Sequence, residues 1–385
     1  MSNSTSSSHI LPSFDSQLGG SVRAALNICK FLIQYGHSAN AIATFSPGDD
    51  VEYLRSEYNI VPCHFLPRSF PARYANSNHI KPWIQKQRIQ PDIVSIHGVW
   101  VLSSFQAALA CLKADIPYVV HPHGSLDPFD LQKRRLQKKL VGPCMIKWLL
   151  DNSRGIVCTT KTELERLETY NSDVMRYTSP LPVPCLSLTS ESNDFRSRFN
   201  IPEDAQVVLF LSRIDYKKGL EYLIPALAML KPRFPKIWFV LAGSGSSSYS
   251  STIDSLIDSH QLNSITTKTG FLSGRDKVEA FNAANIFALP SLNENFGIVV
   301  VEAMNACLPI LISDNVYLSP DIQGASAGVI CSVSVESVYV SLLTMLDGTV
   351  DLPALGNAAK KFAGDFYHPQ QATNGLVNIY HSALS

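Results

Sequence analysis

Several features that would define a class of protein are absent from this sequence. Lysine plus arginine and aspartate plus glutamate both number 32, so the formal net charge is zero. Nucleic-acid binders usually carry a strong basic excess, and its absence argues against that class. No apolar run approaches about eighteen residues, and the serine-rich N-terminus has no apolar core segment. The sequence therefore predicts neither a membrane span nor a signal peptide.

Common metal sites are also missing from the pattern. The eight cysteines are scattered, with no CxxC pair and no cluster with histidine, and most lie in apolar runs. They are typical of small core residues in a reducing compartment. No DxD-like acid pair stands on a loop suited to a metal, because Asp49 and Asp50 lie far upstream. We therefore expect fixed cations, without a metal ion, wherever an anion is held.

What is present indicates two domains of ordinary size. A chain of 385 residues with 45% hydrophobic residues is too long for one core. Residues 1–185 hold 19 basic and 14 acidic side chains, and the remainder hold 13 and 18, so the two parts carry about +5 and −5. Residues 180–184 contain three prolines, which exclude a helix or a central strand and predict a linker.

Short apolar runs alternate with helical patterns on both sides of this linker. The runs predicted as strands are 9–13, 39–45, 60–65, 91–97, 116–120, 155–160, 206–211, 237–242, 265–269, 286–289 and 309–312. Alternation of this kind is typical of parallel sheets covered by helices. The sequence therefore predicts two doubly wound α/β halves that face each other.

The most informative stretch is 291–304, which follows the predicted strand at 286–290 and reads as loop and helix. The amides of residues 296–298 would open the helix, and free N–H groups at a helix N-terminus bind anions. Glu294 and Glu302, eight apart, can face one crevice with that anion. A sugar joined to a phosphate offers both hydroxyls and charge. The alternative is a buried strand at 298–301, which the consecutive valines favour.

Cations and glycines follow other predicted strands of the second half. Arg213 ends one strand and Lys218 precedes Gly219 at a helix start, so these cations can clamp a diphosphate. Lys217 is interpreted as a solvated charge. The loop with Gly243 and Gly245 is weak support by itself. The main chain of residues 270–272 has groups free to read a planar base.

Histidines end two predicted strands of the first half. His97 ends one, and His121 and His123 follow the next. Because ligands of open α/β sheets bind at the carboxyl ends of the strands, we interpret this pattern as functional, although each ring alone is more often structural. Gly19 and Gly20 precede a helix, where backbone can approach a ligand or form a tight turn.

A basic segment follows these histidines. Residues 131–150 read as a basic helix with an apolar stripe at Leu131, Leu136 and Leu140. Two interpretations remain equal: a solvated helix face, or a helix that docks on an anionic membrane leaflet.

Taken together, these motifs resemble those of the retaining glycosyltransferases of family 4, which have the GT-B fold. The motifs are Arg213 with Lys218 and Gly219, Gly243 with Gly245, residues 270–272, Glu294 with Phe296, Gly297 and Glu302, and upstream Gly19 with Gly20 and His123 with Gly124. The resemblance covers nearly the whole chain. It implies two Rossmann-like domains that face a central cleft, at 1–180 and 191–368, with a linker at 181–190 and a C-terminal helix, 369–385, that crosses back to the first domain.

The resemblance also implies roles for individual residues. Arg213 and Lys218 would bind the donor pyrophosphate, Glu294 would contact sugar hydroxyls, His123 would face the transferred sugar, and Glu302 would hold the ribose. Contacts with the nucleotide sugar are implied for Gly19, Gly20, Gly243, Gly245, Phe271, Leu272, Asn295, Phe296, Gly297, Ile298 and Glu302.

The expected reaction is a metal-independent transfer of a hexose, with glucose from UDP-glucose as the first choice, and with retention of configuration. The acceptor would be a glycan or a polyprenyl-diphosphate-linked sugar. The run 122–128 and the basic segment resemble exopolysaccharide and cell-envelope branches of the family, with heterocyst-type envelope polysaccharide as the specific suggestion. We expect a cytoplasmic protein, and the second interpretation of residues 131–150 adds peripheral contact at the cytoplasmic face of the membrane. The alternatives are a same-fold nucleotide-sugar 2-epimerase and a non-catalytic binding module.

Overall fold

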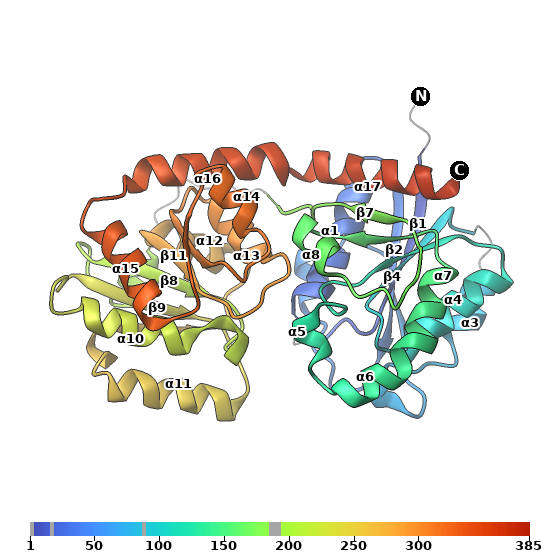
Figure 1. Cartoon of the computed structure of the whole chain (residues 1–385), viewed down its shortest axis with the longest axis horizontal. Coiled ribbons are helices and arrows are strands. Elements are labelled where there is room, and N and C mark those ends of the chain that lie inside the picture. The colour runs from blue at the N-terminus through green and yellow to red at the C-terminus, as the bar shows by residue number, and fades with distance from the viewer. Residues whose placement is uncertain (1–3, 16–18, 87–89, 185–193) are drawn as a thin grey trace. The chain divides into compact units, whose positions relative to one another are not determined.

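The computed structural model describes residues 4–15, 19–86, 90–184 and 194–385, which form two compact units (Figure 1). Unit 1 comprises Met1–Pro182 and Pro369–Ser385, and unit 2 comprises Val183–His368. The part of the expected linker from residue 185 onward lies outside the described residues. Every cysteine that the structure describes is a free thiol.

Unit 1 contains a sheet of seven strands in the order β3-β2-β1-β4-β5-β6-β7, and every pairing is parallel. The strands are β1 (Ser6–Leu11), β2 (Ser38–Phe45), β3 (Cys63–Pro67), β4 (Ile93–His97), β5 (Tyr118–His121), β6 (Gly155–Cys158) and β7 (Arg176–Thr178). The order reverses beside β1, so the carboxyl ends of β1 and β4 flank a topological switch point.

Helices cover this sheet, and the last one comes from the C-terminus. They are α1 (Gly20–Gln34), α2 (Tyr53–Glu57), α3 (Ile80–Gln85), α4 (Leu102–Lys113), α5 (Pro128–Leu131), α6 (Arg135–Val141), α7 (Lys147–Asp151), α8 (Lys161–Arg166) and α17 (Pro369–Leu384). Helix α17 packs beside α1 (Figure 1). The Tyr380 hydroxyl and the buried Ser95 hydroxyl form a hydrogen bond of 2.7 Å, which ties α17 to β4.

Unit 2 contains a sheet of six parallel strands in the order β10-β9-β8-β11-β12-β13. The strands are β8 (Gln206–Leu211), β9 (Ile237–Ala242), β10 (Thr266–Gly270), β11 (Ile286–Leu289), β12 (Ile310–Ser313) and β13 (Val329–Cys331). The helices are α9 (Phe195–Arg198), α10 (Leu220–Leu230), α11 (Ser247–Ser259), α12 (Gly274–Ala283), α13 (Ile298–Asn305), α14 (Ser319–Gly324), α15 (Val335–Leu346) and α16 (Leu352–Phe366). Here the order reverses between β8 and β11.

The first strand begins earlier than predicted. We expected it at 9–13, where apolar residues start, but β1 begins at Ser6. Ser7, Ser8 and His9 are each at most 1% exposed. Serine is small enough for a sheet interior, so a polar run forms a central strand because its neighbours on both sides supply the pairing.

Residues 298–301 form the start of helix α13, so the alternative of a buried strand is wrong. Val300, Val301, Ala303 and Met304 are fully buried in this helix. β-Branched residues are only weakly unfavourable in helices, and the free energy gained by burying these side chains outweighs that preference.

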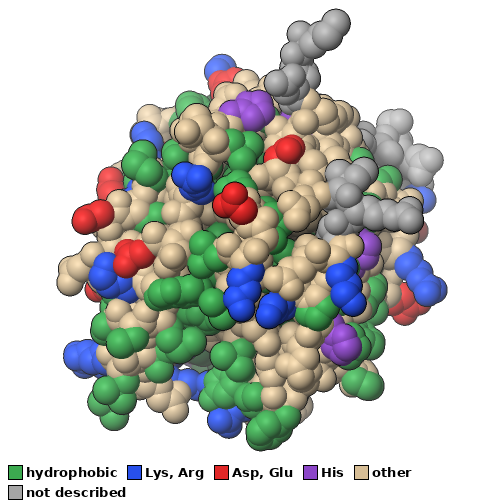
Figure 2. Space-filling model, turned by 90° about the vertical axis from the view of Figure 1, so that its right-hand side faces the viewer, with side chains coloured by type: hydrophobic (Ala, Val, Ile, Leu, Met, Phe, Trp, Pro, Cys, Tyr) green, Lys and Arg blue, Asp and Glu red, His purple; other side chains and the backbone are tan. Residues whose placement is uncertain are grey.

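The basic segment is not the single helix that the sequence indicated. Helix α5 ends at Leu131 and α6 starts at Arg135, with Arg134 in the left-handed region at φ 54°. A π-helical turn, Gly142–Ile146, then leads into α7. Leu136 and Leu140 are each 79% exposed, so the predicted stripe does not pack on the unit. Figure 2 shows hydrophobic side chains along the lower edge of one face of unit 1, with Lys and Arg side chains among them.

None of the helices in the described ranges is both long and apolar enough to cross a bilayer.

Candidate active site

The switch point of unit 2 holds a buried ion pair. Lys218 ends the 3₁₀ turn Tyr216–Lys218 after β8, and Glu294 lies in the loop after β11. The Lys218 ammonium donates to Glu294 Oε2, and the two side chains are 9% and 19% exposed. The main chain of Glu294 is fixed by bonds to Asn315 and Tyr317. A cation and an anion are therefore held at the carboxyl edge of the sheet, where ligands of such folds bind.

Gly219 explains how Lys218 reaches this position. Its φ is 74°, and a Cβ there would lie 1.9 Å from the carbonyl oxygen of Pro290. Only glycine allows the loop after β8 to approach the end of β11 so closely. The same approach brings the Lys218 side chain to Glu294.

Arg213 has a fixed backbone and a free side chain. Its neighbours Ser212 and Ile214 donate backbone hydrogen bonds to Ala242 at 3.1 Å and to Ser244 at 2.8 Å. The Arg213 side chain is exposed and bonds to no described residue. The arrangement leaves this guanidinium available at the sheet edge, although no contact joins it to Lys218.

Gly243 and Gly245 have a structural reason to be glycine. A Cβ at Gly243 would lie 1.9 Å from Ser212 O, and one at Gly245 would lie 2.1 Å from Ile214 O. These two glycines let the loop after β9 pack on the loop that carries Arg213. Their predicted contact with a nucleotide stays a prediction.

The N-terminus of α13 lies against Glu294. Gly297 precedes the helix, and a Cβ there would lie 3.2 Å from Glu294 Cγ. The backbone N–H groups of Phe296, Gly297 and Ile298 donate to no described backbone carbonyl. Their partial positive charge therefore adds to that of Lys218, which makes this end of the helix suited to an anion.

Glu302 lies one turn further along α13 and is held by a lysine that we did not predict. Lys277 Nζ on α12 donates to Glu302 Oε1 at 2.6 Å, and the side chains are 14% and 10% exposed. No spacing within the sequence points to Lys277, because only the fold brings this residue of α12 to Glu302 of α13. Leu272, which leads into α12, is buried, whereas Phe271 is 59% exposed.

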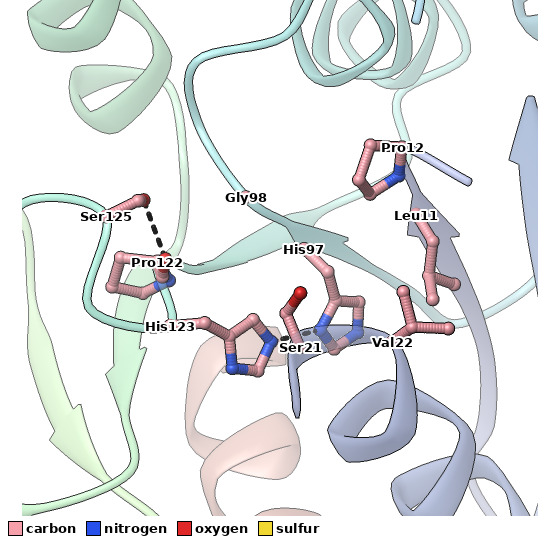
Figure 3. A pocket seen from close by; sticks show the side chains of 9 residues that line it. All are labelled: Leu11, Pro12, Ser21, Val22, His97, Gly98, Pro122, His123 and Ser125. Carbon is pink, nitrogen blue, oxygen red and sulfur yellow. Dashed lines mark hydrogen bonds between the residues drawn. The ribbon is translucent and has the colours of Figure 1, made fainter. Parts of the chain in front are cut away.

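Unit 1 has a cavity of about 120 Å³ at its own switch point (Figure 3). It is lined by Leu11 and Pro12 after β1, His97 and Gly98 from β4, Pro122, His123 and Ser125 after β5, and Ser21 and Val22 at the start of α1. Gly19 and Gly20 open the same helix α1. The sequence placed His123 and this glycine pair near ligands, and the structure brings them to one rim.

Four histidine rings meet beside this cavity. His9 Nδ1 and His97 Nε2 are 3.0 Å apart, and His97 Nδ1 and His123 Nε2 are 2.8 Å apart. His121 stacks on His97 with ring centroids 4.6 Å apart. Burial lowers the pKa of His9 to about 3 and that of His123 to about 4. It also holds the pKa values of His97 and His121 well below the usual 6.5, so all four rings are neutral at pH 7.

The backbone at His123 is held in an uncommon conformation. His123 has φ 51° and Gly124 has φ 76°. The buried Glu163 accepts the Gly124 N–H at 2.6 Å and also the Thr159 N–H at 2.7 Å. A non-glycine residue in this region costs free energy, so the contacts around His123 must hold it there. The sequence carried a signal for Glu163, since Thr160 followed three residues later by Glu is a capping-box pattern.

Not all predicted site residues are joined by contacts. Lys218, Glu294 and residues 296–298 lie together, Glu302 lies beside Lys277, and His123 belongs to the cavity of unit 1. Asn295 sits between Glu294 and Phe296 in the same loop. Across the described ranges, no group of three or more His, Cys, Asp or Glu is arranged to hold a metal ion.

Two Rossmann-like sheets of seven and six parallel strands define the GT-B class of α/β proteins. Residues 191–361 match the family model for glycosyl transferases group 1, and residues 18–176 match that for glycosyltransferase family 4. Together these two matches support a glycosyltransferase of the family 4 type.

Known proteins agree with this assignment. An uncharacterized glycosyltransferase of Methanocaldococcus jannaschii is 27% identical over 195 residues, which are 50% of this chain and 49% of that protein. The alpha-monoglucosyldiacylglycerol synthase of Acholeplasma laidlawii is 25% identical over 316 residues, 78% of either chain. The chain spans about half the length of several curated relatives that it matches.

Among solved structures, Anabaena HepE in complex with UDP and glucose matches with a TM-score of 0.79. It is 17% identical, and the match covers 98% of this chain and 100% of that one. At this identity the likeness shows the fold alone.

The neutral histidines predict a loss of stability in acid. The unfolded chain protonates each ring near pH 6.5, whereas the folded unit does not protonate His9 until about pH 3. These rings therefore leave the free energy of unfolding unchanged above pH 6.5 and lower it below that pH, by up to about 1.4 kcal/mol per pH unit for each ring. Urea unfolding of a Trp238→Phe variant, whose remaining tryptophans all lie in unit 1, measures the free energy at pH 7 and pH 5.

A His121→Phe variant in the same background removes one titrating ring, so its loss of stability over this range should be smaller. Equal free energies of unfolding at pH 7 and pH 5 in the parent would contradict the neutral state of the cluster.

Proposed function

We propose that this protein transfers glucose from UDP-glucose to a glycan or polyprenyl-diphosphate-linked sugar, with retention of configuration. The observation that carries the proposal is the buried Lys218–Glu294 pair beside the N-terminus of α13. One face of this site offers positive charge to a phosphate, and the carboxylate next to it accepts hydrogen bonds from hydroxyls. A sugar joined to a diphosphate presents both groups at this spacing.

The chemistry follows from these charges. The bond between the sugar C1 and the phosphate oxygen breaks, and the acceptor hydroxyl oxygen bonds to C1 on the same face. The hydroxyl proton passes to the departing phosphate oxygen, so no protein nucleophile is required. Lys218, Arg213 and the α13 amides stabilise the negative charge that develops on UDP. In this proposal fixed cations, and not a metal ion, hold the diphosphate.

Glu294 would orient the sugar and Glu302 the ribose. Lys277 holds the Glu302 carboxylate in place at 2.6 Å. The main chain beside the exposed Phe271 would contact the base. Anabaena HepE, which shares the fold, is recorded with UDP and glucose, and this supports the choice of donor. A role in exopolysaccharide or heterocyst-type envelope synthesis follows from the resemblance of residues 122–128 and completes the proposal.

The first prediction concerns the ion pair. Lys218→Ala and Glu294→Ala should each lower kcat for release of UDP from UDP-glucose about 10²- to 10³-fold, because each removes a group that acts on the reacting atoms. The double variant should be equally inactive and fold better, since it leaves no unpaired buried charge. Turnover with a panel of nucleotide sugars and circular dichroism measure the two effects.

Lys217→Ala is the matched control, because it removes the neighbouring ammonium, and it should retain turnover within about twofold. Unaltered rates in both single variants would refute the assigned roles. An epimerised nucleotide sugar as product, or tight binding without release of UDP, would contradict the proposed transfer.

The second prediction concerns nucleotide binding. Lys277→Met should weaken UDP binding about tenfold, because Glu302 loses the cation that orients it, and Lys277→Arg should restore most of the affinity. Titration calorimetry measures the Kd. Lys268→Met, which breaks an exposed ion pair with Asp254 in the same unit, is the control and should bind normally. If the Lys277→Met variant and the parent bind UDP with equal affinity, Lys277 has no role in nucleotide binding.

We further propose that residues 131–150 contact an anionic membrane leaflet from the cytoplasmic side. Leu136 and Leu140 are exposed on α6, and the side chains of Arg134, Arg135 and Lys139 beside them bond to no described residue. Apolar and basic side chains together suit the boundary between acyl chains and anionic headgroups. The relative from A. laidlawii is named for a glucosylated diacylglycerol, which supports a membrane-bound acceptor.

The third prediction tests this surface. The protein should bind vesicles with anionic phospholipid and not neutral ones, and a Leu136→Ser/Leu140→Ser variant should lose most of the binding. Each basic residue removed should weaken it about fivefold, as about 1 kcal/mol per charge implies. Leu109→Ser/Leu112→Ser is the control, since those leucines of α4 are also exposed. Equal loss in both double variants, or equal binding to neutral vesicles, would contradict the proposal.

A further inference from the structure

The histidines of unit 1 form a row with a defined end. Ser7 Oγ lies 3.1 Å from His9 Nε2, His9 Nδ1 lies 3.0 Å from His97 Nε2, and His97 Nδ1 lies 2.8 Å from His123 Nε2. Both ring nitrogens of His9 and His97, and Nε2 of His123, therefore have one partner each. We call these four residues the histidine row. His121 stacks on the row but is not part of it, and its buried Nε2 has no hydrogen-bond partner among the described residues.

Ser7 determines which atom donates in each hydrogen bond of the histidine row. Ser7 is 1% exposed, and the only described partner of its hydroxyl is His9 Nε2. If the hydroxyl accepted a hydrogen bond from His9, its own proton would be buried without an acceptor, which is unfavourable. The Ser7 hydroxyl therefore donates to His9 Nε2.

This direction passes along the row because each ring is neutral. A neutral imidazole has one nitrogen that donates and one that accepts. With Nε2 as acceptor, His9 carries its proton on Nδ1 and donates to His97 Nε2. His97 in turn donates from Nδ1 to His123 Nε2. The remaining proton of His123 must then lie on Nδ1.

His123 Nδ1 is the end of the row that a ligand can reach. In Figure 3 the second ring nitrogen of His123, one of the residues that line the cavity, points away from His97. His123 is partly exposed, and no described residue bonds this atom. The backbone of His123 is fixed by the hydrogen bond from Gly124 to Glu163. The ring therefore has one position and one free nitrogen.

We propose that Ser7, His9 and His97 are positioning residues that fix His123 as the Nδ1–H tautomer, so that this cavity offers a neutral hydrogen-bond donor to a hydroxyl oxygen of the sugar. The identity of the ligand as a sugar rests on the proposed function, whereas the tautomer does not. A nitrogen that already carries a proton cannot take one from the acceptor hydroxyl. His123 is thus a recognition group and not a general base.

The tautomer can be measured without any ligand. Two-bond ¹H–¹⁵N correlations of the ¹⁵N-labelled full chain at pH 7 distinguish a protonated Nδ1 from a protonated Nε2, and single His→Phe variants assign the rings. We expect Nδ1–H for His9, His97 and His123. Ser7→Ala should give a mixture of tautomers at His123, and Ser7→Thr, which keeps the hydroxyl, should restore the single form. An Nε2–H signal for His123 in the parent, or no change in Ser7→Ala, would overturn the proposal.

Two matched variants separate the row from general packing. His97→Phe and His121→Phe make the same substitution at the ends of neighbouring strands, and both side chains are 2% exposed. Only His97→Phe removes hydrogen bonds of the histidine row. His123 should lose its single tautomer in His97→Phe and keep it in His121→Phe, and a loss in both would contradict the role of the row.

Binding of donor analogues then tests recognition. A fluorine in place of a sugar hydroxyl still accepts a hydrogen bond but donates none, whereas hydrogen does neither. At one position of the sugar the deoxyfluoro analogue of UDP-glucose should bind about tenfold more tightly than the deoxy analogue, as one hydrogen bond implies. His97→Phe should abolish this preference and His121→Phe should keep it.

Equal affinities of the fluoro and deoxy analogues at every position would overturn the sugar contact. If UDP-glucose itself is neither bound nor turned over, the proposed function fails, and the spectra still decide the tautomer separately.

Discussion

Parallel pairing throughout both sheets is the constraint on which the rest of this structure depends. Parallel strands need helical crossovers, so the strands of each sheet end at one edge and the helices that follow a strand begin near that edge. The side chains just after the strands meet at that edge. In unit 2 these are Lys218 and Glu294, beside the amides that open α13, and in unit 1 they are His97 and His123. The same geometry thus produces a charged site in one unit and a neutral one in the other.

The two sites differ in the charge state of their buried side chains. In unit 2 the charges are kept and paired, as Lys218 is with Glu294 and Lys277 with Glu302. In unit 1 burial removes charge, since the histidine pKa values fall well below 6.5. A paired cation can exchange its carboxylate partner for an anionic ligand. A neutral imidazole attracts no ion, but it forms a hydrogen bond in one fixed direction. The charged site of unit 2 is suited to an anionic group, and the neutral site of unit 1 is suited to hydroxyl groups.

The sequence predicted much of this fold because local patterns and tertiary packing agree. The apolar runs predicted most of the buried strands, such as β4, β5, β8 and β11, and α13 begins directly after the loop with Glu294. The sequence-based prediction was wrong where contacts with other segments determine the local structure. Ser7 and Ser8 lie in a central strand because β2 and β4 pair with it, and Arg134 interrupts a segment whose leucines suggested one helix. Lys277 and the histidine row depend on contacts between distant segments, which no spacing within one segment reveals. Glu163 carried a capping signal, but its bond to Gly124 required the fold.

The return of α17 to unit 1 has a consequence for how the chain is made. The hydrogen bond between Ser95 and Tyr380 joins residues 285 apart, and all of unit 2 lies between them. During synthesis from the N-terminus, unit 2 has its complete chain before unit 1 has its last helix. Until the ribosome has synthesised residues 369–384, the surface of α1 that α17 later covers therefore stays open to water.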